Sequence, residues 1–162
     1  MPARAIHLLE GATTGAIISA SLTVHGTLGF GCREHIYSLA MERELTSMGH
    51  RVEREVAVMI YYRGEPLTWQ TFDMIVGGRV IVENKAREQL PEGSTEQLFS
   101  YLCSTNLEVG MLLHFGRKVR FHRVICENRY KQHHHSSKGK THEMLRSPVS
   151  TRRLPLVSVS QR

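Results

Sequence analysis

Three ionisable residues lie within apolar segments in the middle of the sequence. The segment from residue 72 to 86 reads FDMIVGGRVIVENKA and carries Asp73, Glu83 and Lys85. Glu83 and Lys85 are two residues apart, so in a strand their side chains point to the same face. Two carboxylates side by side repel each other unless a cation neutralises them or one takes a proton. Such a pair, with a lysine beside it, predicts a site for Mg²⁺ or Mn²⁺ and for charge that develops on a phosphate.

The face that Asp73 occupies depends on the turn between the two strands. A two-residue loop, Gly77-Gly78, would put Asp73 and Glu83 on opposite faces. A three-residue loop, Gly77 to Arg79, would put Asp73 directly opposite Glu83. We favour the three-residue loop because its register leaves one continuous apolar face. That face consists of Phe72, Met74, Val76, Val80 and Val82.

A simpler interpretation competes with the metal site. Lys85 could form a salt bridge with one carboxylate at the exposed end of a hairpin. Ion pairs of this kind are common at strand ends and contribute little to stability. Spacing alone is compatible with both interpretations.

The surrounding patterns predict an α/β protein. Apolar residues recur at helical spacing from Ile6 to Val24 and from Arg33 to Met48, and Gly49 stands where a helix would end. The later elements are predicted as strands 52–62, 67–76 and 80–86, a helix from Ser94 to about residue 105, and strands 109–115 and 119–126. Ser94 and Gln97 fit a capping box at the start of the third helix. The predicted order is ααβββαββ.

Charge divides the chain into two parts. Residues 1–126 hold 13 Lys and Arg against 13 Asp and Glu, whereas residues 127–162 hold 8 against 2. Periodicity also disappears after residue 126. We therefore predict one folded domain over residues 1–126 and a basic, disordered tail over residues 127–162.

The sequence predicts a cytoplasmic protein. No run reaches the 18 or so uninterrupted apolar residues that cross a bilayer, and Glu10 interrupts any apolar region of a signal peptide. Cys32, Cys103 and Cys126 are an odd number of cysteines at wide spacings, so reduced thiols are expected.

The order of these residues resembles the PD-(D/E)XK nuclease superfamily. Asp73 lies on one predicted strand and Glu83-Asn84-Lys85 on the next, with a helix before them and a helix and strand after them. More narrowly, the segment GCREHIY at 31–37 resembles the signature of the bacterial GxxExxY proteins, which are small members of that superfamily. Further similar segments are Val24-His25, 28–31, 61–64 and 97–102. The resemblance runs from about Ile6 to Cys126.

This resemblance implies an αβββαβ core, a central mixed sheet flanked by helices, and metal-dependent cleavage of nucleic-acid phosphodiesters. It implies that Asp73 and Glu83 bind Mg²⁺ or Mn²⁺ and that Lys85 is the catalytic lysine. Glu34 would be the helix carboxylate that reaches the same metal. Four residues apart on one helical face, Gln97 and Tyr101 would line the cleft and contact the nucleic-acid backbone. The capping role of the Gln97 amide would compete with this second role.

We therefore expect a metal-dependent nuclease, a hydrolase, with DNA favoured over RNA as its partner and no membrane association. The alternative is a nucleic-acid-binding module of the same fold that cleaves poorly. Asp73, Glu83 and Lys85 favour the enzyme, because a module without catalysis has no need to hold two like charges together.

Overall fold

The computed structural model describes residues 9–131 and confirms the predicted order of elements. The helices are α1 (Gly11–Leu28), α2 (Glu34–Ser47) and α3 (Ser94–Cys103). The strands are β1 (Val52–Tyr62), β2 (Glu65–Val76), β3 (Val80–Lys85), β4 (Val109–Phe115) and β5 (Val119–Ile125). The bounds of the later elements agree with the sequence patterns to within two residues, whereas α1 begins at Gly11 and extends past the predicted Val24.

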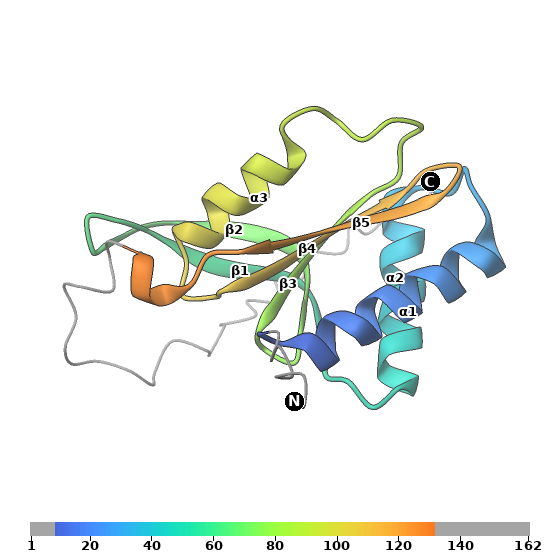
Figure 1. Cartoon of the computed structure of the whole chain (residues 1–162), viewed down its shortest axis with the longest axis horizontal. Helices are drawn as coiled ribbons and strands as arrows, with labels where there is room; N and C mark the ends of the chain where they lie inside the picture. The colour runs from blue at the N-terminus through green and yellow to red at the C-terminus, as the bar shows by residue number, and fades with distance from the viewer. Residues whose placement is uncertain (1–8, 132–162) are drawn as a thin grey trace, which may run out of the picture.

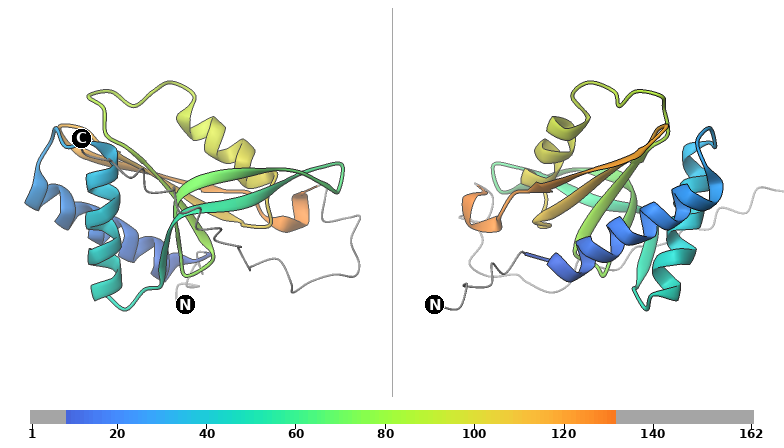
Figure 2. Two further views of the ribbon diagram at one scale, coloured as in Figure 1. Left: turned by 180° about the vertical axis from the view of Figure 1, so that it is seen from behind. Right: turned by 45° about the vertical axis from the view of Figure 1, so that its right-hand side comes forward.

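The strands form one mixed sheet with the order β1-β2-β3-β4-β5. Strands β3 and β4 are parallel, and the other neighbouring pairs are antiparallel. A parallel pair needs a crossover connection, and α3 supplies it on one face of the sheet. Helices α1 and α2 lie on the other face, so the sheet is the middle layer of three (Figures 1 and 2).

Each face of the sheet has its own apolar core. The larger core lies under α1 and α2 and contains Tyr37, Met41, Met74, Val82 and Leu113 among its buried residues. The smaller core lies under α3. Its buried residues are Phe72, Ile81, Leu98, Leu102, Leu112 and Val124. Alternate residues of β3, β4 and β5 therefore point to opposite helical layers, as the period of two requires.

The β2–β3 hairpin has the three-residue loop that the sequence favoured. Val76 pairs with Val80, and Met74 pairs with Val82. Gly77 and Gly78 have φ values of 62° and 68°, which side chains with a Cβ rarely adopt. Continuing this register by one residue places Asp73 opposite Glu83.

The predicted face of Phe72 is wrong. Phe72 packs in the smaller core, with its ring edge-on to Tyr101 at 5.8 Å between centroids, whereas Met74 lies in the larger core. The cause is in the neighbouring strand, where Glu55 has a φ of 53° and the β1–β2 ladder skips Glu55 and Asp73. This local distortion breaks the alternation of side chains at Asp73.

The predicted capping box is also wrong. The N-cap of α3 is Gly93, and no side chain in the described part of the chain caps this helix. The Ser94 hydroxyl instead donates a hydrogen bond to the Pro91 carbonyl at 2.6 Å. The Gln97 side chain is therefore exposed and available for another role.

The expectation of reduced cysteines fails for two of the three. Cys103, at the end of α3, and Cys126, directly after β5, form a disulfide, while Cys32 is free. This disulfide ties the helix to the edge strand of the sheet. Disulfides persist mainly in oxidising compartments, so the predicted cytoplasmic location gains no support from this feature.

Ordered structure continues past residue 126, where the sequence predicted the tail to begin. Asn128–Tyr130 form a short 3₁₀ helix, and the Lys131 side chain is only 2% exposed. The ammonium of Lys131 donates to the carbonyls of Thr105 and Leu107. Residues 132–162, most of the predicted tail, lie outside the described residues. Within the described part, no helix has the length and apolar character needed to span a membrane.

Candidate active site

The structure brings Asp73 and Glu83 together where β2 and β3 part. The last ladder pair before this point is Met74 with Val82. Beyond it, the Asp73 carboxylate accepts a hydrogen bond from the Asn84 backbone N–H at 2.7 Å. The Glu83 carboxylate in turn accepts the backbone N–H of Asp73. Side chains thus replace the strand ladder here, and they fix the two carboxylates next to each other.

Lys85 completes this group on the α3 side of the sheet. Its Nζ lies 3.7 Å from Glu83 Oε2, and the two side chains are 25% and 19% exposed. The geometry includes the ion pair that the simpler interpretation expected. That pair leaves Asp73 without a cationic partner among the described residues.

The carboxyl group of Glu83 has a strongly raised pKa. Burial, followed by the negative charge of Asp73, raises the pKa of Glu83 from 4.5 to about 7. Glu34 raises this pKa further, whereas Lys85 and the Asp73 N–H lower it. Lys85 therefore does not fully neutralise the nearby carboxylates. An additional cation would reduce the repulsion between them.

Glu34 approaches from the first turn of α2. Its Oε2 accepts a hydrogen bond from the Ala86 N–H at 3.3 Å, directly after β3. The loop before α2 is held by Tyr37, whose hydroxyl donates to the Gly29 carbonyl at 2.7 Å and accepts from the Cys32 N–H at 3.3 Å. The Tyr37 ring stacks on Phe115 with 4.4 Å between centroids. Tyr37 thus anchors the position from which Glu34 reaches the site.

A pocket of about 390 Å³ opens beside Glu34 and Lys85, and neither Asp73 nor Glu83 lines it. It is lined by Glu34, Lys85, Arg87, Gln97 and neighbouring residues of the 91–94 segment. Gln97, which the resemblance implied as a cleft residue, is among the lining residues. Tyr101 is not among the lining residues, and its ring packs instead against Phe72.

Two polar residues near the site were assigned no role from the sequence. Asn84 is fully buried on the α2 side, where its Nδ2 donates to Ser38 Oγ at 2.9 Å. Its Oδ1 has no hydrogen-bond partner among residues 9–131. His114 lies beside Lys85 in the β3–β4 register, and its Nε2 is 2.7 Å from the Arg87 carbonyl. A single histidine inside the apolar run of β4 was the available signal for this position.

The carboxylates suit a hard cation, although they do not form a complete protein cage. No group of three or more His, Cys, Asp or Glu side chains within residues 9–131 is arranged to hold a metal ion. Mg²⁺ commonly takes one or two carboxylates and completes its coordination with waters and substrate phosphates. The oxygen donors of Asp73 and Glu83, with the raised pKa of Glu83, fit that requirement.

A comparison with known families agrees with this architecture. The model of the PD-(D/E)XK nuclease superfamily matches residues 11–124. The chain belongs to the PD-(D/E)XK nuclease superfamily. The matched range contains the whole five-stranded sheet except the last residue of β5, together with α1, α2 and α3. No curated protein and no solved structure matches the chain significantly.

Membership of the PD-(D/E)XK superfamily indicates a nuclease-type function. Its members are generally nucleases, which are hydrolases of nucleic acids, and they typically use divalent metal ions. The mixed sheet with helices on both faces is consistent with the fold of this superfamily.

Proposed function

We propose that this protein is a metal-dependent nuclease of the GxxExxY type that hydrolyses phosphodiester bonds, with DNA favoured over RNA. Asp73 and the Glu83-Asn84-Lys85 segment correspond to the aspartate and the (D/E)XK of the superfamily name. The observation that carries the proposal is the crowding of Asp73 and Glu83 beside Lys85, with the pKa of Glu83 raised to about 7.

Each residue of the site has a distinct role in this proposal. Asp73 and Glu83 would hold Mg²⁺ or Mn²⁺, and Glu34 would supply a third carboxylate from α2. A bound divalent cation supplies an activated water and stabilises negative charge on the phosphate. The Lys85 ammonium donates hydrogen bonds to the attacking water and orients it toward the phosphorus.

Two residues of α3 are proposed to contact the substrate. The exposed Gln97 amide can donate to a phosphate oxygen from the wall of the pocket. Tyr101 lies one helical turn further on and is half-buried against Phe72. Its substrate contact would therefore be limited to the exposed part of the ring, so Gln97 carries the larger share.

Cleavage and metal binding can be separated by substitution. Asp73→Asn or Glu83→Gln should weaken metal binding and abolish cleavage, whereas Lys85→Ala should spare metal binding and lower the turnover rate. Removal of a positioned catalytic group typically lowers the rate by about 10²–10⁴-fold. Thermal melts with Mn²⁺ and with EDTA, beside cleavage of single- and double-stranded DNA and RNA, provide both measurements.

The salt-bridge interpretation predicts different results for the same experiment. If the salt-bridge interpretation is correct, Mn²⁺ does not raise the melting temperature, and the three variants cleave as the parent does. Arg43→Ala is a matched control, because Arg43 is exposed on α2 and takes part in no ion pair within the described part of the chain.

A binding module of the same fold is the second candidate. The 3.7 Å ion pair between Lys85 and Glu83 favours it, as does the absence, within residues 9–131, of three side chains already arranged to hold a metal ion. This module would bind nucleic acid in EDTA as tightly as in Mg²⁺ and would release no cleaved product. Metal-dependent product formation that Asp73→Asn abolishes excludes it.

A further inference from the structure

Charge is distributed unevenly over the folded domain. Residues 1–126 hold equal numbers of basic and acidic residues, 13 of each. Residues 109–126, which form the β4–β5 hairpin and its flanks, hold four Lys and Arg and no Asp or Glu. A neutral domain therefore carries one strongly basic element.

Part of this charge has no partner. Arg117 pairs with Glu88 at 2.9 Å, and Arg123 donates to the backbone on the side of α1. Lys118 and Arg120 are exposed and form no ion pair within residues 9–131. These two side chains remain available for an anionic ligand.

The strand register connects this charge to the candidate active site. Lys85 lies opposite His114 in the β3–β4 pair, and His114 lies opposite Arg120 in the β4–β5 pair. Val124, which packs under α3, shows that the even-numbered residues of β5 face the α3 side. Arg120 and the exposed His122 therefore share a face with Lys85.

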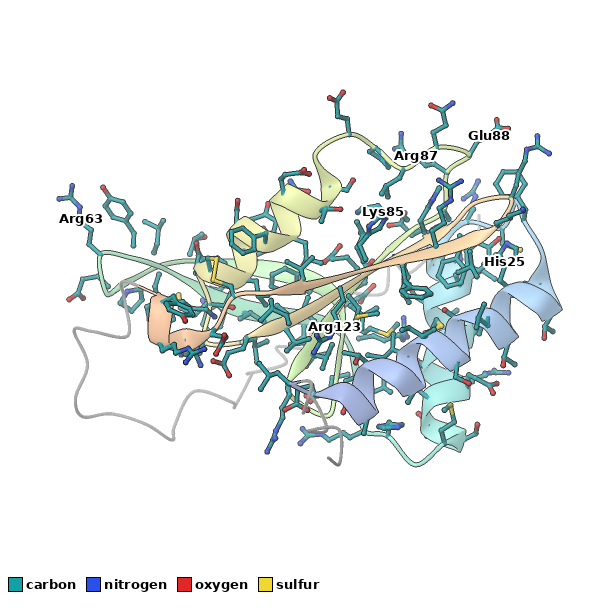
Figure 3. All side chains as sticks on the ribbon, viewed as in Figure 1. His25, Arg63, Lys85, Arg87, Glu88 and Arg123 are labelled. Carbon is teal, nitrogen blue, oxygen red and sulfur yellow. A yellow bond between two sulfur atoms is a disulfide. The ribbon has the colours of Figure 1, made fainter. Side chains whose placement is uncertain are left out.

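The figures agree with this assignment. Lys85 and Arg87 lie on the α3 side of the sheet, whereas Arg123 lies on the side of α1 (Figure 3). Neighbouring strands are about 4.8 Å apart, so two steps across the sheet span roughly 10 Å. The exposed Arg87, in the segment that follows β3, adds a cation near the beginning of this path.

We propose that Arg120 and His122 of β5, with Lys118 of the turn before it, bind the phosphate backbone of the double-stranded nucleic acid that the site cleaves; these three residues are here called the β5 strip. Unpaired cations that lead away from a phosphodiester site complement the charge of a duplex. Proteins hold single strands largely through bases stacked on aromatic side chains. The strip has no Phe, Tyr or Trp, and Phe121, the exposed phenylalanine of β5, faces the opposite side of the sheet.

This inference rests on the proposed function, because Arg120 lies two strands across the sheet from the proposed catalytic lysine, Lys85. Binding of the full-length protein to a DNA duplex in EDTA, where the metal-dependent reaction cannot run, tests the strip independently of cleavage. Arg120→Glu should raise Kd by about tenfold at low salt, and Arg120→Ala should reduce the slope of log K against log salt by about 0.9, the value for one phosphate contact. Arg43→Glu and Arg43→Ala are the matched controls on the other face of the sheet.

Each outcome decides one question. If Arg120→Glu and Arg43→Glu bind the duplex equally, or if a single strand of the same length depends more strongly on Arg120 than the duplex does, the β5 strip is not the duplex contact. Cleavage that still depends on Asp73 would then leave the proposed function intact. If no variant or parent cleaves in Mg²⁺ but duplex binding depends on Arg120, the nuclease proposal fails and the interface stands.

Discussion

Asp73 and Glu83 are held together by the backbone, so their repulsion has little room to relax. The Asn84 N–H binds the Asp73 carboxylate, and the Asp73 N–H binds the Glu83 carboxylate. Asp73 is the single aspartate of the sequence, and its short side chain reaches the Asn84 N–H where the strand ladder ends. The fold thus keeps two carboxyl groups close together at the proposed metal site.

The raised pKa of Glu83 predicts that stability depends on pH. In the unfolded chain this carboxyl loses its proton near its ordinary pKa of 4.5, whereas in the folded protein it does so near 7. Between these values the folded state binds more protons, so the free energy of unfolding falls as pH rises through this window. The full effect is on the order of 3 kcal/mol.

Replacing Glu83 with glutamine tests this dependence without metal. In EDTA, Glu83→Gln should be more stable than the parent at pH 8, by up to roughly 3 kcal/mol, and the difference should disappear near pH 4. Urea unfolding at both pH values measures it. A stability difference that is the same at pH 4 and pH 8 would show that Glu83 ionises normally in the folded protein.

Helix α3 is the element that forms one wall of the pocket and covers the smaller core. Its N-terminal part presents Gln97 to the pocket, and its C-terminal end is tied to the end of β5 by the Cys103–Cys126 disulfide. Because the two cysteines are 23 residues apart, the disulfide closes a short loop of the unfolded chain. Cross-links of this size typically stabilise the folded state by about 3 kcal/mol.

A reductant should therefore lower the melting temperature of the parent protein. Cys103→Ser should melt at the temperature of the reduced parent and should not respond to reductant. Cys32→Ser is the matched control, since Cys32 is free and its loss should leave the response to reductant unchanged. An unchanged melting temperature of the parent on reduction would contradict a stabilising disulfide.

The elements show which features a sequence pattern can predict. The register of the β2–β3 hairpin followed from alternation, because only one register gave a continuous apolar face, and the structure has that register. The face of Phe72 could not follow, because the alternation is broken by the left-handed conformation of Glu55 in a different strand. The Cys103–Cys126 disulfide could not be predicted from the sequence pattern either, because it depends on how α3 packs beside β5.

The register of a single hairpin also made part of the candidate site predictable. Asp73, Glu83 and Lys85 lie within one hairpin, where local register decides their proximity. The position of Glu34 depends on the loop that Tyr37 anchors, and the resemblance rather than the spacing brought it to attention. The nearness of His114 and Arg120 to Lys85 needed the β3–β4 and β4–β5 pairings, which no local pattern contains.

At the scale of the whole molecule, the folded domain and its basic extension meet at Lys131. This lysine is buried, and its ammonium donates to the carbonyls of Thr105 and Leu107 in the α3–β4 connection. Burial lowers its pKa from 10.5 to about 8, an effect that the charge of Glu108 opposes. Residues 127–131 therefore belong with the domain, and residues 132–162, with six Lys and Arg against one Glu, carry most of the excess charge.

Two truncations separate these parts. A chain that ends after Lys131 should keep the melting temperature of the parent and its metal-dependent rate at saturating substrate. Its affinity for nucleic acid should fall at moderate salt, because fewer cations contact phosphates.

A chain that ends after Cys126 should melt at a lower temperature, because the Lys131 hydrogen bonds and the packing of the 3₁₀ helix are lost. Hydrogen bonds from a charged group contribute about 1.5–3 kcal/mol. Equal melting temperatures for the two truncations would place the domain boundary at residue 126, and a lower saturated rate in the folded, longer truncation would assign residues 132–162 a part in the chemistry.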